Sequence, residues 1–140
     1  MEQAHGELRV STRGKGLYEI TREVARWISQ QRVRDGLLTL FIRHTSASLI
    51  IQENADFDVR RDLSEFFERL VPENTPWFRH TTEGADDMPS HIRAALTAVQ
   101  LSIPVRGGQM LLGTWQGIYV FEHRTEPQSR HVLMHIIGDS

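Results

Sequence analysis

The sequence of 140 residues contains no cysteine, and this absence removes a whole group of functions. Without thiols the chain forms no disulfide, no thiolate zinc site, no iron–sulfur cluster and no cysteine nucleophile. Any metal site must therefore use histidine, carboxylate or backbone oxygen ligands. Seven histidines are present, so a histidine-based site is the alternative to test.

Long hydrophobic runs and an excess of basic charge are absent as well. The longest uninterrupted apolar run is Ile118–Phe121, far short of the ~20 residues that a membrane-spanning helix needs. The formal net charge is −2, so the clustered basic face typical of nucleic-acid binding is not expected. The first residues lack the basic and apolar pattern of a signal peptide. We therefore expect a cytoplasmic protein that binds neither nucleic acid nor a membrane.

The periodicity of apolar residues predicts an α+β fold in one domain spanning residues 1–140. Strands are expected at 7–12, 37–43, 47–51, 101–105, 110–115, 118–123 and 130–137. Helices are expected at about 18–31, at 56–70, and from Pro89 onward. Because helices and strands do not alternate regularly, we expect a mostly antiparallel, sandwich-like sheet with two to three flanking helices.

Two of the expected helices carry an apolar stripe. The stripe of the helix at 56–70, which we expect to be buried, consists of Val59, Leu63, Phe66, Phe67 and Leu70. In the helix that follows Pro89, we expect Ile92, Leu96 and Val99 to face inward.

The first candidate site segment is the run from Arg43 to Ser48. In a strand, His44 continues the face of Leu38, Leu40 and Ile42, so its imidazole lies at the mouth of the core beside three hydroxyl groups. A half-buried structural histidine is the simpler interpretation. Further on, Asp56 is expected to cap the second helix, whereas Asn54 either caps or points into a site shared with His44.

The second segment runs from His80 to His91 and holds two histidines and three carboxylates without any core pattern. A solvated surface loop is one interpretation. His91, however, lies near a helix start, where the helix dipole disfavours a charged imidazole and so favours the neutral, metal-binding form. With His44, the two histidines have the composition of an open zinc site.

The third segment is Gly113–Arg124. Its glycines, on either side of Trp115-Gln116, indicate a bulge or a close approach of the backbone. Glu122 is an acid on an apolar row, and buried acids are usually paired. Arg130 is the expected partner, either in a structural ion pair or in a pocket that holds phosphate, with Glu122 as proton carrier.

Together these segments resemble the YjbQ-like family, often labelled secondary thiamine-phosphate synthases. The resemblance rests on HTSAS (44–48), ENADFDVRRDL (53–63), HTTEGADDMPSHI (80–92) and GTWQGIYVFEHR (113–124), and covers about residues 6 to 138. It implies a β-sandwich-like fold assembled as a homotrimer, with a metal pocket built from these motifs.

Carried over position by position, the resemblance implies the following site. The metal ligands are His44, His80 and His91. The catalytic residues are Glu122, Asp87 and Arg130. The substrate-binding residues are Ser46, Ser48, Asn54, Glu83, Asp86, Thr114 and Gln116.

The implied reaction joins hydroxymethylpyrimidine diphosphate to thiazole phosphate and releases pyrophosphate. Three histidines select zinc, whereas Glu83, Asp86 and Asp87 offer oxygens that suit Mg²⁺ with a phosphorylated substrate. A three-histidine site fits metal-activated water better than diphosphate displacement. A metal-dependent hydrolase of a small phosphorylated or acyl substrate therefore stays open, as does a non-catalytic metal- or ligand-binding trimer.

Overall fold

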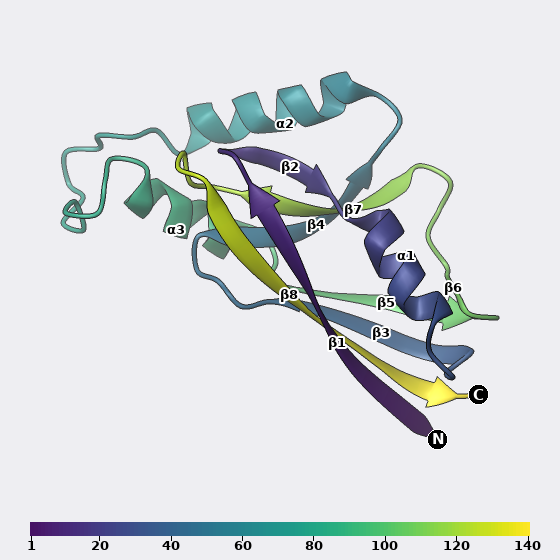
Figure 1. Cartoon of the computed structure of the whole chain (residues 1–140). Coiled ribbons are helices and arrows are strands. Elements are labelled where there is room, and N and C mark those ends of the chain that lie inside the picture. The colour runs from purple at the N-terminus through teal and green to yellow at the C-terminus, as the bar shows by residue number, and fades with distance from the viewer.

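Eight strands and three helices make up the computed structural model, which describes all residues from Met1 to Ser140. The helices are α1 (Thr21–Ser29), α2 (Phe57–Leu70) and α3 (Asp87–Leu96). The strands are β1 (Glu2–Thr12), β2 (Gly16–Glu19), β3 (Asp35–Ile42), β4 (Ala47–Glu53), β5 (Gln100–Arg106), β6 (Gln109–Met110), β7 (Gln116–Glu122) and β8 (Gln128–Asp139). Figure 1 shows their arrangement.

The strands form two antiparallel sheets. The larger sheet has the order β1-β8-β3-β5-β6, and the smaller has the order β2-β7-β4. Every strand pair is antiparallel. The expected α+β fold with a mostly antiparallel, sandwich-like sheet is therefore confirmed.

The core lies between the two sheets and is completed by α1. Alternate residues of β3 and β8, such as Leu40 and Met134, face inward and pack with β7 residues such as Val120. Val24 and Ile28 of α1 are fully buried in the same cluster. This rigid body fixes the positions of the strand ends.

The two later helices are less buried than their sequences predict. No residue of α2 is buried, and Phe66 and Leu70 are more than half exposed, so the expected buried stripe is wrong at these two positions. Phe67 of α2 does pack edge-to-face on Phe121. The helix lies on the outer side of the small sheet (Figure 1), which offers only a narrow contact.

In α3 the inward face is polar. The buried residues of α3 are Asp87, Pro89, Ser90 and Arg93, three of them polar. Leu96 at the end of α3 and Val99 beyond it, which the apolar spacing placed inside, are exposed. The buried face of α3 contributes side chains to hydrogen bonds and ion pairs rather than to the apolar core. For this reason Leu96 lies on the exposed side, opposite to the prediction.

Further differences concern short elements. The four-residue strand β2 has no counterpart in the prediction, so the first helix begins at Thr21 rather than at about residue 18. The expected strand at 110–115 shrinks to β6. The turn between β5 and β6 is made by Gly107 and Gly108, both with positive φ. No helix of the structure combines the length and the apolar character needed to span a membrane.

Four strand ends meet on the side of the molecule where α3 lies (Figure 1). The start of β4 pairs with the end of β7, through Ala47 and Glu122. The end of β3 pairs with the first half of β8, through Ile42 and Val132. The residues that follow or precede these ends form the site described next.

Candidate metal site and its surroundings

Two histidines and one aspartate converge at the start of α3. Nε2 of His80 lies 2.6 Å from Oδ2 of Asp87, and Nε2 of His91 lies 3.0 Å from the same oxygen. The potential ligand atoms of these three residues all lie within 4.8 Å of one another. The arrangement is a cluster of two imidazoles around one carboxylate oxygen.

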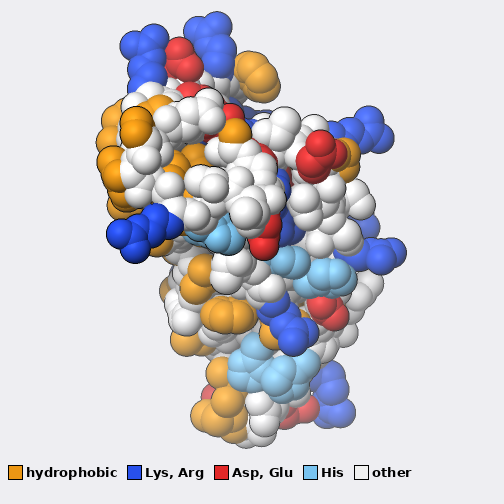
Figure 2. Space-filling model, turned by 90° about the vertical axis from the view of Figure 1, so that its left-hand side faces the viewer, with side chains coloured by type: hydrophobic (Ala, Val, Ile, Leu, Met, Phe, Trp, Pro, Cys, Tyr) orange, Lys and Arg blue, Asp and Glu red, His pale blue; other side chains and the backbone are white.

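The local structure explains this convergence. Asp87 is the first residue of α3 and His91 lies four residues later, so their side chains share one face of the helix. His80 comes from the loop before α3. The side chain of Asp87 is 2% exposed, whereas those of His80 and His91 are 42% and 31% exposed. The cluster is therefore buried at Asp87 and open to solvent at the two histidines. Figure 2 shows a face of the molecule on which several histidine side chains are visible.

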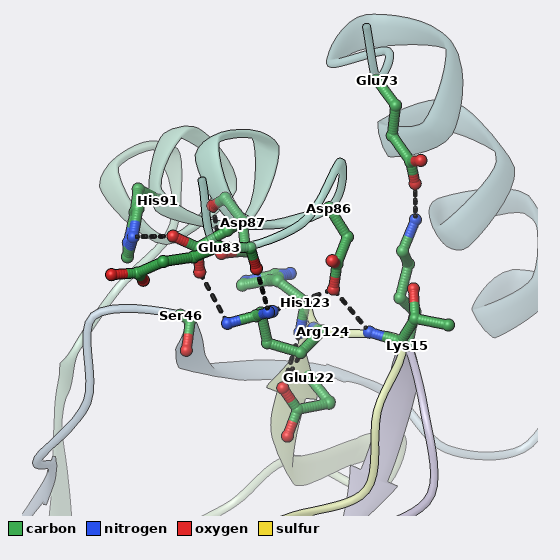
Figure 3. A network of polar contacts seen from close by, with 12 residues as sticks. Lys15, Ser46, Glu73, Glu83, Asp86, Asp87, His91, Glu122, His123 and Arg124 are labelled. Atoms are coloured by element: carbon green, nitrogen blue, oxygen red, sulfur yellow. Dashed lines mark hydrogen bonds and ion pairs between the residues drawn. The ribbon is translucent and has the colours of Figure 1, made fainter. Parts of the chain in front are cut away.

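Arg124, just beyond the end of β7, holds the carboxylates in place (Figure 3). Its Nη1 donates to Oδ1 of Asp87 at 2.6 Å, and its Nε donates to Oδ2 of Asp86 at 2.9 Å. The backbone N–H of Thr125 donates to the same oxygen of Asp86. Because Arg124 binds Oδ1 of Asp87, the other oxygen points to the histidines.

The electrostatics of the cluster favour a charged Asp87. Burial alone would raise the pKa of this carboxyl group, but the hydrogen bond to His80 and the electrostatic interactions with His91 and Arg124 outweigh burial and lower the pKa below its ordinary value. The result is an ionised carboxylate whose free oxygen faces two imidazoles. Glu83 lies at the rim, with Oε2 3.8 Å from Nε2 of His80.

His44 lies outside this cluster, and the expected convergence of three histidines is therefore corrected. Nε2 of His44 accepts a hydrogen bond from the backbone N–H of His131 at 2.9 Å. Its Nδ1 faces Nη1 of Arg130 at 3.3 Å. A histidine at the end of β3 is thus held by β8, the neighbouring strand, rather than by α3.

Glu122 and Arg130 form an ion pair, the structural one of the two alternatives that the sequence left open. Nε of Arg130 donates to Oε1 of Glu122 at 2.7 Å, and the hydroxyl of Thr12 donates to the same oxygen. Burial raises the pKa of Glu122, but Arg130 and Thr12 lower it more strongly, so the carboxyl group is charged. Glu122 is fully buried, which argues against its expected role as a proton carrier for a substrate.

The remaining expected substrate-binding residues divide between the site and remote positions. Ser46 lies beside Arg130, whereas Ser48 is fully buried, with its Oγ 2.9 Å from Nε2 of His123. Asn54 follows the far end of β4, and its expected sharing of a site with His44 is wrong for that reason. Gln116 pairs with Glu53 at the same far end, and Thr114 lies nearby in sequence, so neither reaches the cluster.

Sequence reasoning missed two functions within the cluster. Asp87 was expected to act in catalysis or in a Mg²⁺ site, yet it is the residue that joins the two histidines. Arg124 was not singled out at all. Its only sequence signal is its position directly after a buried strand and within the string GTWQGIYVFEHR, where an arginine close to an acidic loop could have indicated a partner.

Known proteins resemble this chain over nearly its whole length. The family model described as UPF0047 protein YjbQ-like matches residues 6–139. A UPF0047 protein from Synechocystis is 50% identical over 130 residues, which cover 93% of this chain and 88% of that protein. The UPF0047 protein YjbQ from Escherichia coli O157:H7 is 42% identical and covers 94% of this chain and 96% of that protein.

Solved structures show the same fold. A conserved hypothetical protein from Thermus thermophilus matches with a TM-score of 0.84 at 33% identity, over 94% of this chain and 99% of that chain. A protein of unknown function from Sulfolobus solfataricus matches with a TM-score of 0.89 at 22% identity, over 99% of each chain. The second likeness concerns the fold alone.

These comparisons overturn the expected reaction. The relatives are described as UPF0047 proteins, and the Sulfolobus protein as one of unknown function, so membership assigns no activity. The expectation of thiamine-phosphate synthesis, which rested on the family, is therefore wrong. The hydrolase alternative rested on three converging histidines and loses that basis, because His44 lies outside the cluster. What sequence and fold do establish together is that the chain belongs to the UPF0047 family of YjbQ-like proteins.

Proposed function

We propose that the protein binds one divalent transition-metal ion through Nε2 of His80, Oδ2 of Asp87 and Nε2 of His91. Two imidazoles and one carboxylate are the ligand set of many zinc and non-haem iron sites. Two nitrogen ligands favour Zn²⁺ or Fe²⁺ over Mg²⁺, which prefers oxygen. When bound, the ion supplies a Lewis acid with open coordination positions.

The hydrogen bond of His91 to the backbone carries this proposal. Nδ1 of His91 lies 2.9 Å from the carbonyl oxygen of Thr45, so Nδ1 must carry the ring proton and donate it. In the neutral ring, Nε2 then presents a lone pair to Oδ2 of Asp87 at 3.0 Å. Two lone pairs at that distance repel each other unless a cation lies between them.

That cation is either a proton or a metal ion. A metal has two properties in its favour. Metal–ligand bonds of about 2.1 Å place two ligand atoms about 3 Å apart at a right angle and about 3.4 Å apart in a tetrahedron. The His91–Asp87 pair at 3.0 Å therefore needs little rearrangement, whereas the His80–Asp87 pair at 2.6 Å must open to admit the ion. A histidine that donates its other ring nitrogen to a backbone carbonyl is also the usual form of a metal ligand. A proton would instead leave a His–Asp–His ion cluster without metal.

Metal titration decides between these two. The chelator-treated protein is expected to bind one Zn²⁺ per chain in calorimetry. His91→Ala and Asp87→Asn should each weaken binding by at least about a hundredfold, because each removes a ligand. His135→Ala is the matched control, since His135 lies on the large sheet, where it hydrogen-bonds to Gln3.

His44→Ala gives the sharpest comparison. This variant should retain the zinc stoichiometry and affinity, since His44 lies outside the cluster. Loss of zinc in His44→Ala would support the three-histidine set and contradict the His–Asp–His set. Equal zinc affinity of the wild type, His91→Ala and Asp87→Asn would overturn the proposal, provided that circular dichroism shows all three folded.

A further inference from the structure

A pocket with both apolar and polar lining residues lies next to the metal cluster, on the other side of Thr45. Its volume is about 440 Å³, and its polar lining comes from Arg43, His44, Thr45, Ser46 and Arg130. Thr45 lines this pocket, and its carbonyl oxygen accepts a hydrogen bond from His91. One residue of the β3–β4 connection therefore touches both the cluster and the pocket.

The hydrogen bonds of His44 determine which ring nitrogen carries the proton. The backbone N–H of His131 donates to Nε2 of His44 at 2.9 Å, so Nε2 is an acceptor. The ring proton therefore lies on Nδ1. Burial, and after it the charge of Arg130, lowers the pKa of His44 below 6.5 and keeps the ring neutral near pH 7.

Two donors meet where His44 faces Arg130. Nδ1 of His44 and Nη1 of Arg130 lie 3.3 Å apart. A guanidinium group has no acceptor, and the protonated Nδ1 has none either, so the two groups do not satisfy each other. The side chain of Arg130 is 95% buried, and buried donors are almost always paired with an acceptor.

Further donors and one net positive charge line the same pocket. Oγ of Ser46 accepts from Nη2 of Arg130 at 2.9 Å, which leaves the hydroxyl proton of Ser46 free to donate. Glu122 neutralises Arg130. Arg43 is exposed and has no carboxylate within 4.0 Å, so it supplies the uncompensated charge.

We propose that this pocket binds the phosphate group of a small ligand. Phosphate oxygens accept from Nδ1 of His44, Nη1 of Arg130 and the hydroxyl of Ser46, and Arg43 balances the charge. Charge-assisted hydrogen bonds of this kind are the strong ones in proteins. The phosphate group belongs to the inorganic ion or to a phosphorylated small molecule. The inference goes beyond metal binding and does not depend on it.

Calorimetry with inorganic phosphate tests the pocket. The measurement uses the full chain at low ionic strength and pH 7.5 with excess EDTA, so that the result is independent of zinc binding. Saturable binding with one phosphate per chain is expected. Ser46→Ala and His44→Phe should each weaken it about tenfold, the effect of one hydrogen bond to a charged group. Ser102→Ala and His135→Phe, on the same sheet but outside the pocket, should bind like the wild type.

Nuclear magnetic resonance keeps the test decisive if His44→Phe does not fold. The ¹⁵N signals of His44 should show the proton on Nδ1, and phosphate should shift them more than those of His135. Glycerol phosphate in place of inorganic phosphate identifies the source: tighter binding favours a phosphorylated small molecule, and equal binding favours the inorganic ion. A proton on Nε2 of His44, or no saturable phosphate binding by the wild type, would overturn the inference.

Discussion

At the scale of single residues, His123 makes stability depend on pH. The ring is fully buried, and Nε2 contacts the hydroxyl of Ser48, while Nδ1 has no hydrogen-bond partner. Burial, aided by the nearby charge of Arg93, lowers the pKa of His123 from 6.5 to about 3. The unfolded chain therefore binds a proton below pH 6.5 that the folded protein does not take up.

The sign of the effect follows from this difference. Stability conferred by the neutral ring is fully present above pH 6.5 and is lost as the pH falls from 6.5 toward 3. Between pH 7.5 and pH 5.5 the wild type should lose about 1.4 kcal/mol through this group. Urea unfolding of the wild type and of His123→Gln at both pH values checks this. The variant should show a smaller loss, and equal losses would contradict the assignment.

Arg124 is the residue whose removal should cost most stability near the cluster. Its guanidinium pairs with Asp86 and Asp87, whose side chains are 13% and 2% exposed. Arg124→Gln removes the only guanidinium that contacts these two carboxylates, which should lower the free energy of unfolding by about 3 kcal/mol. His80, His91 and the backbone N–H of Thr125 still contact them in this variant. Chemical denaturation in EDTA measures the loss.

Arg69→Gln is the matched control for that substitution. Arg69 pairs with Glu65 on the exposed surface of α2, and such pairs contribute less than about 1 kcal/mol. Equal effects of Arg124→Gln and Arg69→Gln would show that Arg124 is not needed to hold the carboxylates of α3.

Residue identity predicted part of the candidate site, and tertiary contacts decided the rest. His80 and His91 stood out because they share a segment without a core pattern. Placing His44 with them failed, because no sequence period shows whether a strand end meets α3 or the neighbouring strand. The sequence likewise could not show that Arg124 reaches a carboxylate 37 positions before it.

At the scale of elements, α2 gives two phenylalanines that are adjacent in sequence different degrees of burial. Phe67 packs on Phe121 with ring centroids 5.3 Å apart, whereas Phe66 is 56% exposed. Phe67→Ala should destabilise the protein by about 2 kcal/mol, less than a fully buried phenylalanine because Phe67 is half-buried, and Phe66→Ala by less than about 1 kcal/mol. Thermal or urea unfolding of both variants checks the difference. Similar losses would mean that α2 buries both rings.

The predicted elements succeeded where apolar periodicity was long. The eight-residue strand β3 and the helix α2 fall close to their expected positions. β2 spans only four residues, too few for a period to show. The wrong prediction of the buried face of α3 has another cause. That face makes polar contacts, which cannot be predicted from the spacing of apolar residues.

At the scale of the whole molecule, the outer face of the large sheet is not covered by a helix. Leu37 and Phe41 of β3 point outward there and are each 42% exposed. Apolar side chains grouped on an open face are typical of association surfaces. They support the homotrimer that the family resemblance implies, which stays a prediction.

Light scattering measures this assembly directly. The expected mass is three times the 16.1 kDa of one chain. Leu37→Glu should lower the mass toward that of one chain, because it places a charge in the contact. Leu70→Glu is the matched control, since Leu70 on α2 is exposed to a similar degree but lies on the other side of the sandwich. A monomeric wild type, or an unchanged mass of Leu37→Glu, would contradict assembly through this face.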